Sequence, residues 1–270
     1  MDSNLKEIKL FYASLGIFSF ATSIIEIFVP LYFLDKGFSI SSILLFFALT
    51  QLGRFVFLPL GAWLSCSFGA KKIMSMAFVF SIVFYMLLRE ISDLSFNFYF
   101  SSVFYGMIQA FLWLTILVHL SKISPDKDKG KIVGRLSIYT AIASATGPVL
   151  GGLVIAVYGF SSAFLLVVFL IIPSIFLLLI TPERSMIRKI HFGSVNIKKV
   201  YPDLVANGFF NFQEFLGLIV WPIFIFIILP QYNTIGFIQT IALFVSIIAF
   251  HFIGNLTDKV RKKKFFFMAV

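Results

Sequence analysis

The chain has 270 residues, of which 60% are hydrophobic and only 13% are charged, and its formal net charge is +10. Soluble domains contain about 45–50% apolar and about 25% charged residues, so this composition excludes an ordinary soluble protein. Several apolar runs reach the length of about 20 residues that a helix needs to cross a bilayer. The sequence therefore predicts an all-α polytopic membrane protein.

Eight membrane spans are expected along the chain, followed by the beginning of a ninth. The first apolar run is too long for the core of a signal peptide, so we expect it to remain as a membrane helix. The eight spans are predicted at residues 9–34, 40–65, 72–89, 95–120, 132–158, 161–181, 204–229 and 233–255. Residues 265–270, FFFMAV, would open the ninth.

Basic residues alternate between the predicted loops. Most of the 22 Lys and Arg residues lie before the first span, between spans two and three, four and five, and six and seven, and after the eighth. The opposite loops hold only Lys36 and Arg89. The positive-inside rule therefore predicts a cytoplasmic N-terminus in the cell membrane. The net positive charge is a topology signal, and it does not indicate binding to nucleic acid.

The longest polar connection, residues 182–202, divides the predicted spans into two groups. We interpret it as a cytoplasmic linker. It would join an N-terminal six-helix bundle, residues 1–181, to a partial C-terminal bundle, residues 203–270, that holds helices 7 and 8 and the start of helix 9.

An internal repeat relates the two groups of spans. Residues 201–270 can be laid on residues 9–78 without a gap, at an offset of 192. The matched positions include Pro30 with Pro222, Lys71 with Lys263 and Lys72 with Lys264. Parallel repeats of this kind are a recurring plan in secondary transporters. We therefore expect a six-plus-six-helix protein whose second half is incomplete in this chain.

Two loops carry related copies of one pattern. The loop after the second span reads AWLSCSFGAKK (62–72), and the loop after the eighth reads GNLTDKVRKKK (254–264). Both resemble the loop signature G-x-L-a-D-r-f-G-r-k-k of the major facilitator superfamily. The motif positions of interest are Cys66, Gly69, Lys71 and Lys72 in the first copy and Gly254, Asp258 and Arg261 in the second.

The resemblance implies that the loop aspartate belongs to a charged latch that favours an outward-facing state. Cys66 stands at the aspartate position of the first copy and is neutral unless its thiol is ionised. Asp258 is kept in the second copy, where Arg261 replaces the second glycine. Gly69 would permit a tight turn, and the lysines would anchor cytoplasmic helix ends.

The fifth span contains a second point of resemblance. Its segment ASATGPVLGG, residues 143–152, resembles the g-x-x-x-G-P-x-x-G-G segment of the same family, which is often associated with antiporters. The matching positions are Gly147, Pro148, Gly151 and Gly152. Small residues four apart let another helix approach closely, so either a gating element of the family or ordinary helix packing explains the pattern.

Three charged residues lie deep inside predicted spans, namely Glu26, Arg54 and Glu214. Such charges are costly and indicate a functional site by default. We interpret Glu26 and Glu214 as proton- or cation-binding candidates, because burial penalises the charged form of an acid and favours proton exchange near neutral pH. Arg54 would be their countercharge. The alternative is an Arg–Glu pair that only fixes helix packing.

Three amide side chains inside the spans are further candidates, namely Gln109, Asn211 and Gln213. Each could hydrogen-bond a substrate or tie two helices together. The fourth span has Ser102, four residues before Gly106, where proton-coupled drug exporters of the family carry an arginine. The resemblance therefore gives no support to that route of proton coupling.

Taken together, these patterns predict a secondary active transporter that works by alternating access. The fifth span favours antiport and export of a small molecule, and uptake of a nutrient or metabolite stays open. The rival hypothesis is a degenerate transporter that acts as a membrane scaffold or receptor. No enzyme motif, metal-ligand spacing or cofactor motif is present in the sequence. The expected partners are a small solute, a proton or Na⁺ as coupling ion, and the lipid bilayer, without nucleic acid.

Overall fold

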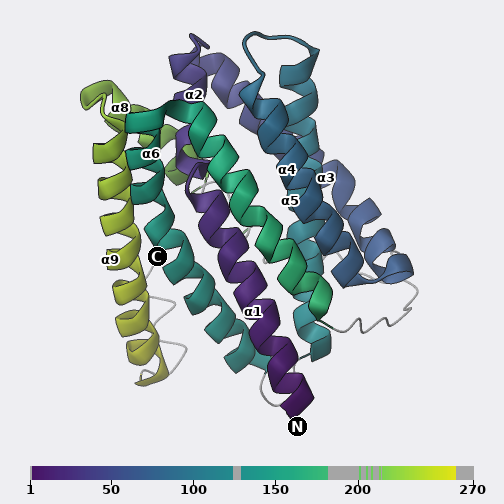
Figure 1. Cartoon of the computed structure of the whole chain (residues 1–270). Coiled ribbons are helices and arrows are strands. Elements are labelled where there is room, and N and C mark those ends of the chain that lie inside the picture. Colours follow the sequence, from purple (N-terminus) through teal and green to yellow (C-terminus); the bar gives the residue numbers. More distant parts are fainter. Residues whose placement is uncertain are drawn as a thin grey trace.

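The computed structural model describes residues 2–123, 129–181, 201, 205, 208, 213 and 215–259, with side chains described for 7–120, 134–181, the four single residues and 215–249. Every regular element within these residues is a helix (Figure 1). The predicted linker, apart from Tyr201, and the predicted start of a ninth span lie outside this part of the chain.

The first span is a broken helix. It consists of α1 (Asp2–Ser23), the 3-10 turn η1 (Glu26–Phe28) and α2 (Val29–Asp35). Pro30 explains the break, because it has no N–H and so leaves the carbonyl of Glu26, four residues earlier, without its α-helical donor. The N–H of Val29 bonds this carbonyl instead, which tightens the chain into a 3-10 turn.

The second and third spans meet at a glycine. α3 (Ile40–Phe68) begins after Ser39, whose hydroxyl oxygen accepts a hydrogen bond from the N–H of Ser42 at 3.2 Å and caps the helix. α4 (Ala70–Arg89) starts immediately after Gly69, which has a φ of +99°. Only glycine adopts this backbone region without strain, so the residue permits the abrupt change of direction.

The fourth span is α5 (Phe96–Ile123), and α6 (Lys129–Ile180) carries the fifth and sixth. α6 has 52 residues, which is more than twice the length that one crossing requires. Its backbone leaves the helical region at Gly159, where φ is +78°. Figure 1 shows the two arms of α6, residues 129–158 and 160–180, running in opposite directions from this turn.

The seventh span contains another irregular turn. Its elements are the π turn η3 (Leu216–Val220) and α8 (Trp221–Ile228), and α9 (Tyr232–Lys259) is the eighth span. Pro222 lies in the first turn of α8, as Pro30 does in the first turn of α2. The two prolines are equivalents in the predicted repeat, so both copies of this span carry an irregular turn just before the same position.

Six helices in the described part of the chain are long and apolar enough to cross a membrane. They are Glu7–Asp35, Ile40–Phe68, Ala70–Arg89, Phe96–Leu120, Gly134–Ile180 and Tyr232–Ala249, and Leu216–Ile228 is a shorter apolar helix. Large apolar side chains point outward, such as Phe55, 76% exposed, and Phe96, 77% exposed. Apolar surface on this scale is typical of a lipid-facing protein.

Helix packing joins the later spans to the first six. α1 packs against α6, α3 against α5, and α4 against both α5 and α6. α9 packs against α6, and α8 contacts α2. We call the end of the molecule that holds α2, the Gly159 turn and the turn between α8 and α9 the upper end, as it is oriented in Figure 1. Some of these helix contacts lie at this end.

Candidate functional site

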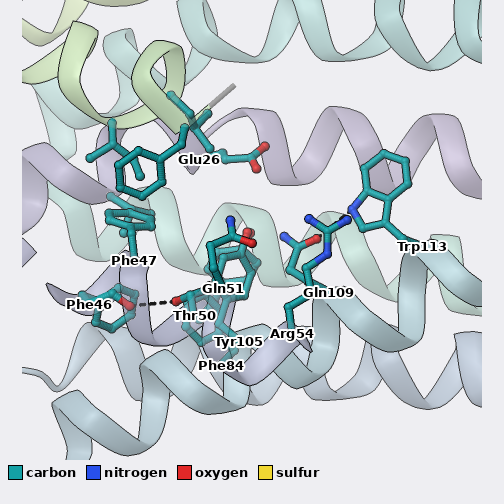
Figure 2. A pocket seen from close by; sticks show the side chains of 15 residues that line it. Glu26, Phe46, Phe47, Thr50, Gln51, Arg54, Phe84, Tyr105, Gln109 and Trp113 are labelled. Atoms are coloured by element: carbon teal, nitrogen blue, oxygen red, sulfur yellow. Dashed lines mark hydrogen bonds between the residues drawn. The ribbon is translucent and has the colours of Figure 1, made fainter. Parts of the chain in front are cut away.

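A cavity of about 140 Å³ is lined by residues of the first four spans and of the seventh (Figure 2). An apolar protein cavity of about 150 Å³ holds a molecule of benzene, so this cavity suits a small solute. Its polar lining residues are Glu26, Thr50, Gln51, Arg54, Tyr85, Tyr105 and Gln109. Its other lining residues are Val29, Phe46, Phe47, Phe84, Trp113, Phe215, Leu218 and Ile219.

Two glycines bring α3 and α5 together into one wall of this cavity. A Cβ atom on Gly53 would lie 2.7 Å from the carbonyl oxygen of Val103. One on Gly106 would overlap the carbonyl oxygen of Thr50 and lie 2.6 Å from the backbone nitrogen of Arg54. Because no side chain separates the two backbones, α5 holds the α3 segment that carries Arg54 in a fixed position.

The α5 side of the wall is built from Tyr105, Gln109 and Trp113, which follow one another at four-residue intervals and so share a helix face. The indole Nε1 of Trp113 donates to Oε1 of Gln109 at 3.0 Å. An indole N–H can only donate, so this bond turns the amide oxygen toward Trp113 and leaves the NH₂ group for other acceptors. The ring of Tyr105 stacks on Phe84 with centroids 4.4 Å apart.

Glu26 enters the cavity from the break in the first span. Its carboxylate and the guanidinium of Arg54 both point into the cavity from different walls (Figure 2). Leu218, the repeat equivalent of Glu26, also lines the cavity from the π turn η3. The irregular turns of the first and seventh spans therefore face the same space, between the two predicted repeats, which is where secondary transporters place their ligand sites.

The structure brings together Glu26, Arg54 and Gln109 from the six predicted binding residues. Gln213 is helical and exposed, and it does not line the cavity. Asn211 and Glu214 lie outside the described residues, so their roles stay predictions. Among the residues that the structure describes, no group of three or more His, Cys, Asp or Glu side chains could hold a metal ion.

Sequence reasoning missed the aromatic half of the cavity. Tyr85, Tyr105 and Trp113 face it, and both tyrosines lie within electrostatic range of Glu26. The four-residue spacing from Tyr105 through Gln109 to Trp113 is a signal that could have revealed the α5 wall. In a sequence with 37 phenylalanines, no comparable signal separates Phe46 or Phe84 from lipid-facing residues.

The first loop motif forms a buried junction between helix ends. Gly69 and Lys71 are buried, Cys66 is half-buried and Lys72 is exposed. The Nζ of Lys71 donates to the carbonyl of Leu179 at 2.9 Å and to that of Thr181. It therefore caps the C-terminal end of α6, where free carbonyls attract a cation.

The second loop motif is described less fully. Gly254 and Asp258 are helical residues of α9 whose side chains lie outside the described set, and Arg261 lies outside the described residues altogether. Whether the second copy repeats the contacts of the first therefore stays a prediction.

The glycine–proline segment of α6 contacts two other helices. Cβ atoms on Gly147 and Gly151 would overlap Ser23 and Ile24 at the end of the first helical segment. On the other face, a Cβ atom on Gly152 would lie 2.5 Å from the carbonyl oxygen of Tyr232. The first span and α9 therefore approach the same stretch of α6 from two sides.

Pro148 interacts with α9 as well. The chain stays helical through Pro148, and a Cβ atom on Gly236 would overlap its carbonyl oxygen. The N–H of Val149, the next residue, donates to Oγ1 of Thr240 at 3.1 Å. This interhelical hydrogen bond ties the fifth span to the eighth.

A second, more open hollow of about 440 Å³ lies at the upper end. Tyr232, the first residue of α9, donates its hydroxyl to Oδ1 of Asp35 at 3.2 Å. Its ring packs edge-on against Phe160 at 5.2 Å and stacks on Phe226 at 5.1 Å. One side chain thus links the first, sixth, seventh and eighth spans at this end.

Comparison with known proteins places the chain in a family. The model of the Major Facilitator Superfamily matches residues 11–270, nearly the whole chain. None of the curated proteins matches it. The expected all-α polytopic membrane fold is confirmed, and with it a place among transporters of small solutes rather than among enzymes. The chain belongs to the Major Facilitator Superfamily.

Proposed function

We propose that the protein moves a small solute across the cell membrane as a secondary active transporter that works by alternating access. The observation that carries this proposal is the cavity that holds Glu26, Arg54 and Gln109 and that the irregular turns of the first and seventh spans both line. Charges at such a depth are costly and are typical of a substrate or ion path. Glu26, together with Glu214, is the candidate site for a coupling proton or Na⁺.

The basic loops favour a cytoplasmic N-terminus. In that orientation the upper end faces outward, and the contacts of α9 with α6 and α2 there correspond to a state closed to the outside. Gly152, Pro148 and Gly236 would then lie along the surface where the two bundles separate. The glycine–proline segment favours antiport and export, and uptake is the alternative direction.

One observation favours a different function. Cys66 occupies the position of the loop aspartate, so the first loop lacks the charge that the family's latch uses. This substitution supports a membrane scaffold or receptor that has lost transport. Retention of charged residues around the cavity supports transport instead.

Counterflow in proteoliposomes tests the proposal without a known substrate. Vesicles holding the purified protein are loaded with unlabelled, ultrafiltered cell extract and placed in the same extract carrying a stable-isotope label. Mass spectrometry then identifies solutes that enter faster than into protein-free vesicles. We expect at least one such solute, and we expect its exchange to be lost in Glu26→Gln.

Glu90→Gln is the matched control, because it removes the same charge from an exposed residue at the upper end. We expect its counterflow to equal that of the unchanged protein. If the unchanged protein exchanges no solute, the scaffold or receptor hypothesis replaces transport.

A further inference from the structure

The open hollow at the upper end is separate from the cavity that holds Arg54, and the two share no lining residue. Its volume of about 440 Å³ falls in the range of about 300–1,000 Å³ that is typical of ligand sites. The end of the first span, the end of α4, the Gly159 turn of α6 and the first residue of α9 all contribute to its lining. It therefore lies where four parts of the chain meet.

Two cations converge on this hollow. The predicted loops at the upper end hold only two Lys or Arg residues, Lys36 and Arg89, and both line the hollow. Within the described part of the chain neither side chain forms an ion pair. Because basic residues are sparse at this end, the meeting of both in one hollow indicates a site for a negatively charged group.

Tyr32 brings the two cations to the same place. Its hydroxyl donates to the carbonyl oxygens of Arg89 at 3.0 Å and Ile91 at 3.3 Å, which ties the first span to the end of α4. Lys36 follows Tyr32 by one helical turn, since its N–H donates to the Tyr32 carbonyl at 3.0 Å. The Nζ of Lys36 lies 5.7 Å from the centroid of the Tyr32 ring. Two segments far apart in the sequence thus present their cations around one buried tyrosine.

The α6 side of the hollow adds groups that suit an oxyanion. Ser161 lines the hollow and is exposed, and its hydroxyl is a hydrogen-bond donor. The arm 160–180 begins here, after Gly159, and the beginning of a helix carries a partial positive charge. Both features add to the attraction that the two cations exert on an anion.

One carboxylate, that of Asp35, opposes this attraction. Its Oδ1 accepts a hydrogen bond from the Tyr232 hydroxyl at 3.2 Å. Glu90 follows Arg89 in the chain but does not line the hollow. Two cations and one carboxylate give the lining side chains a formal net charge of +1, so the hollow favours a ligand with a single negative charge.

The hollow borders the lipid-facing surface. Tyr158, one of its lining residues, is 72% exposed, and Val157 beside it in the chain is 69% exposed. Tyrosines are enriched where membrane helices reach the water interface, and phospholipid headgroups lie at the same level. Basic pockets between membrane helices bind anionic headgroups. A phospholipid can therefore place its phosphate in the hollow while its chains cover the apolar surface of α6.

We propose that the hollow binds the phosphate of an anionic phospholipid headgroup through Arg89, Lys36 and the Ser161 hydroxyl. The planar guanidinium matches two phosphate oxygens, and the ammonium adds a point charge. The net charge of the lining complements phosphatidylglycerol, which carries one negative charge, and favours it over phosphatidylcholine, which is neutral as a whole. This site goes beyond the proposed function and does not depend on it, because it concerns lipid binding and not transport.

Thermal unfolding of the purified protein in one detergent tests the proposal. Dioctanoyl phosphatidylglycerol and dioctanoyl phosphatidylcholine are titrated separately, because they share their chains and differ in the headgroup. A basic residue near an anionic lipid strengthens binding about fivefold. We therefore expect phosphatidylglycerol to reach half-maximal stabilisation at a concentration lower by about this factor or more. Equal stabilisation by the two lipids would overturn the proposal.

A soluble probe distinguishes a lipid from a free phosphate compound. Glycerophosphoglycerol carries the headgroup of phosphatidylglycerol without the acyl chains. We expect it to give no stabilisation at the concentrations at which the lipid saturates. If it stabilises the protein as well as the lipid does, the ligand is a soluble phosphodiester, and the assignment to a lipid is wrong.

Three variants assign the contacts. Arg89→Gln and Lys36→Gln each remove one cation, so we expect each to weaken the effect of phosphatidylglycerol about fivefold. Asp35→Asn removes the opposing charge and should strengthen it. Stabilisation by phosphatidylcholine should stay as in the unchanged protein in all three, which shows that each variant is folded.

Lys72→Gln is the matched control, because it removes the same charge from an exposed residue at the other end of α4. We expect its response to phosphatidylglycerol to equal that of the unchanged protein. If Lys72→Gln weakens the response as much as Arg89→Gln and Lys36→Gln do, the lipid responds to the overall charge of the protein, and the hollow is not its site.

Discussion

The absence of a side chain at Gly106 sets the distance between α3 and α5. A Cβ atom there would overlap the Thr50 carbonyl oxygen and approach the Arg54 nitrogen. We expect Gly106→Ala to destabilise the protein by about 1–3 kcal/mol, the usual cost of overpacking, and to slow counterflow because it displaces Arg54. Thermal unfolding and the counterflow assay measure the two effects.

Gly134→Ala is the control for this prediction, because no atom of the described residues lies within 4 Å of a Cβ atom built on Gly134. Alanine favours the helix over glycine by about 1 kcal/mol, so we expect unchanged or slightly higher stability there. Similar losses in both variants would show that the close contact at Gly106 does not govern the α3–α5 distance.

Lys71 stabilises the junction between α4 and the end of α6, and its side chain is buried, which is uncommon for a lysine. It is buried and donates to the carbonyls of Leu179 and Thr181. In Lys71→Met the side chain keeps its length but the carbonyls lose their donor, which costs about 1–3 kcal/mol for buried groups. Thermal unfolding should show this loss, and the same substitution at the exposed Lys72 should cause little change.

At the scale of elements, the seam between α6 and α9 depends on one interhelical hydrogen bond and close backbone contact. Thr240→Val keeps the shape of the side chain but leaves the Val149 N–H without this acceptor. Interhelical hydrogen bonds in membranes average about 0.6 kcal/mol and reach about 1.7 kcal/mol. We expect a loss in this range, measured by unfolding with tryptophan fluorescence.

Thr234→Val is the matched control for the seam. The Thr234 hydroxyl bonds Gln231 next to it in the chain, so its loss leaves the contact between α6 and α9 intact. An equal loss of stability in the two variants would mean that the Thr240 bond does not stabilise the seam.

At the scale of the whole molecule, the sequence predicts the membrane crossings well, because the length of an apolar run and the charge of a loop can each be read from a short stretch of sequence. The turn at Gly159 falls between two predicted spans for this reason. Glu26, Arg54 and Gln109 could be singled out because polar groups stand out in an apolar helix.

Other features depend on contacts that no local pattern reveals. The sequence around Lys71 is the same whether its side chain faces water or the end of another helix, so its burial could not be predicted. The 3-10 and π turns before Pro30 and Pro222 could be expected as breaks, but that both face one cavity follows from packing. Tyr105 and Trp113 were missed, although they flank Gln109 at four-residue intervals, because aromatic residues are common throughout this chain.

The contact between the first span and α9 at the upper end gives the last prediction, which follows from the proposed alternating access and concerns the balance between open and closed states. The Tyr232 hydroxyl holds Asp35 across the join between the first span and α9. Tyr232→Phe keeps the ring packing and removes only this bond, worth about 0.5–1.5 kcal/mol. We therefore expect roughly a two- to twelvefold shift toward states open at this end.

Spin labels measure the shift. With Cys66→Ser as background, cysteines at Glu90 and Gln231 place labels on exposed positions of the two sides. Tyr232→Phe should increase the population of longer distances, because the bundles separate more often once the bond is gone. Tyr158→Phe makes the same change at an exposed tyrosine of the same hollow and should leave the distances unchanged. If neither variant changes them, helix packing alone, through Gly152 and Gly236, keeps this end closed.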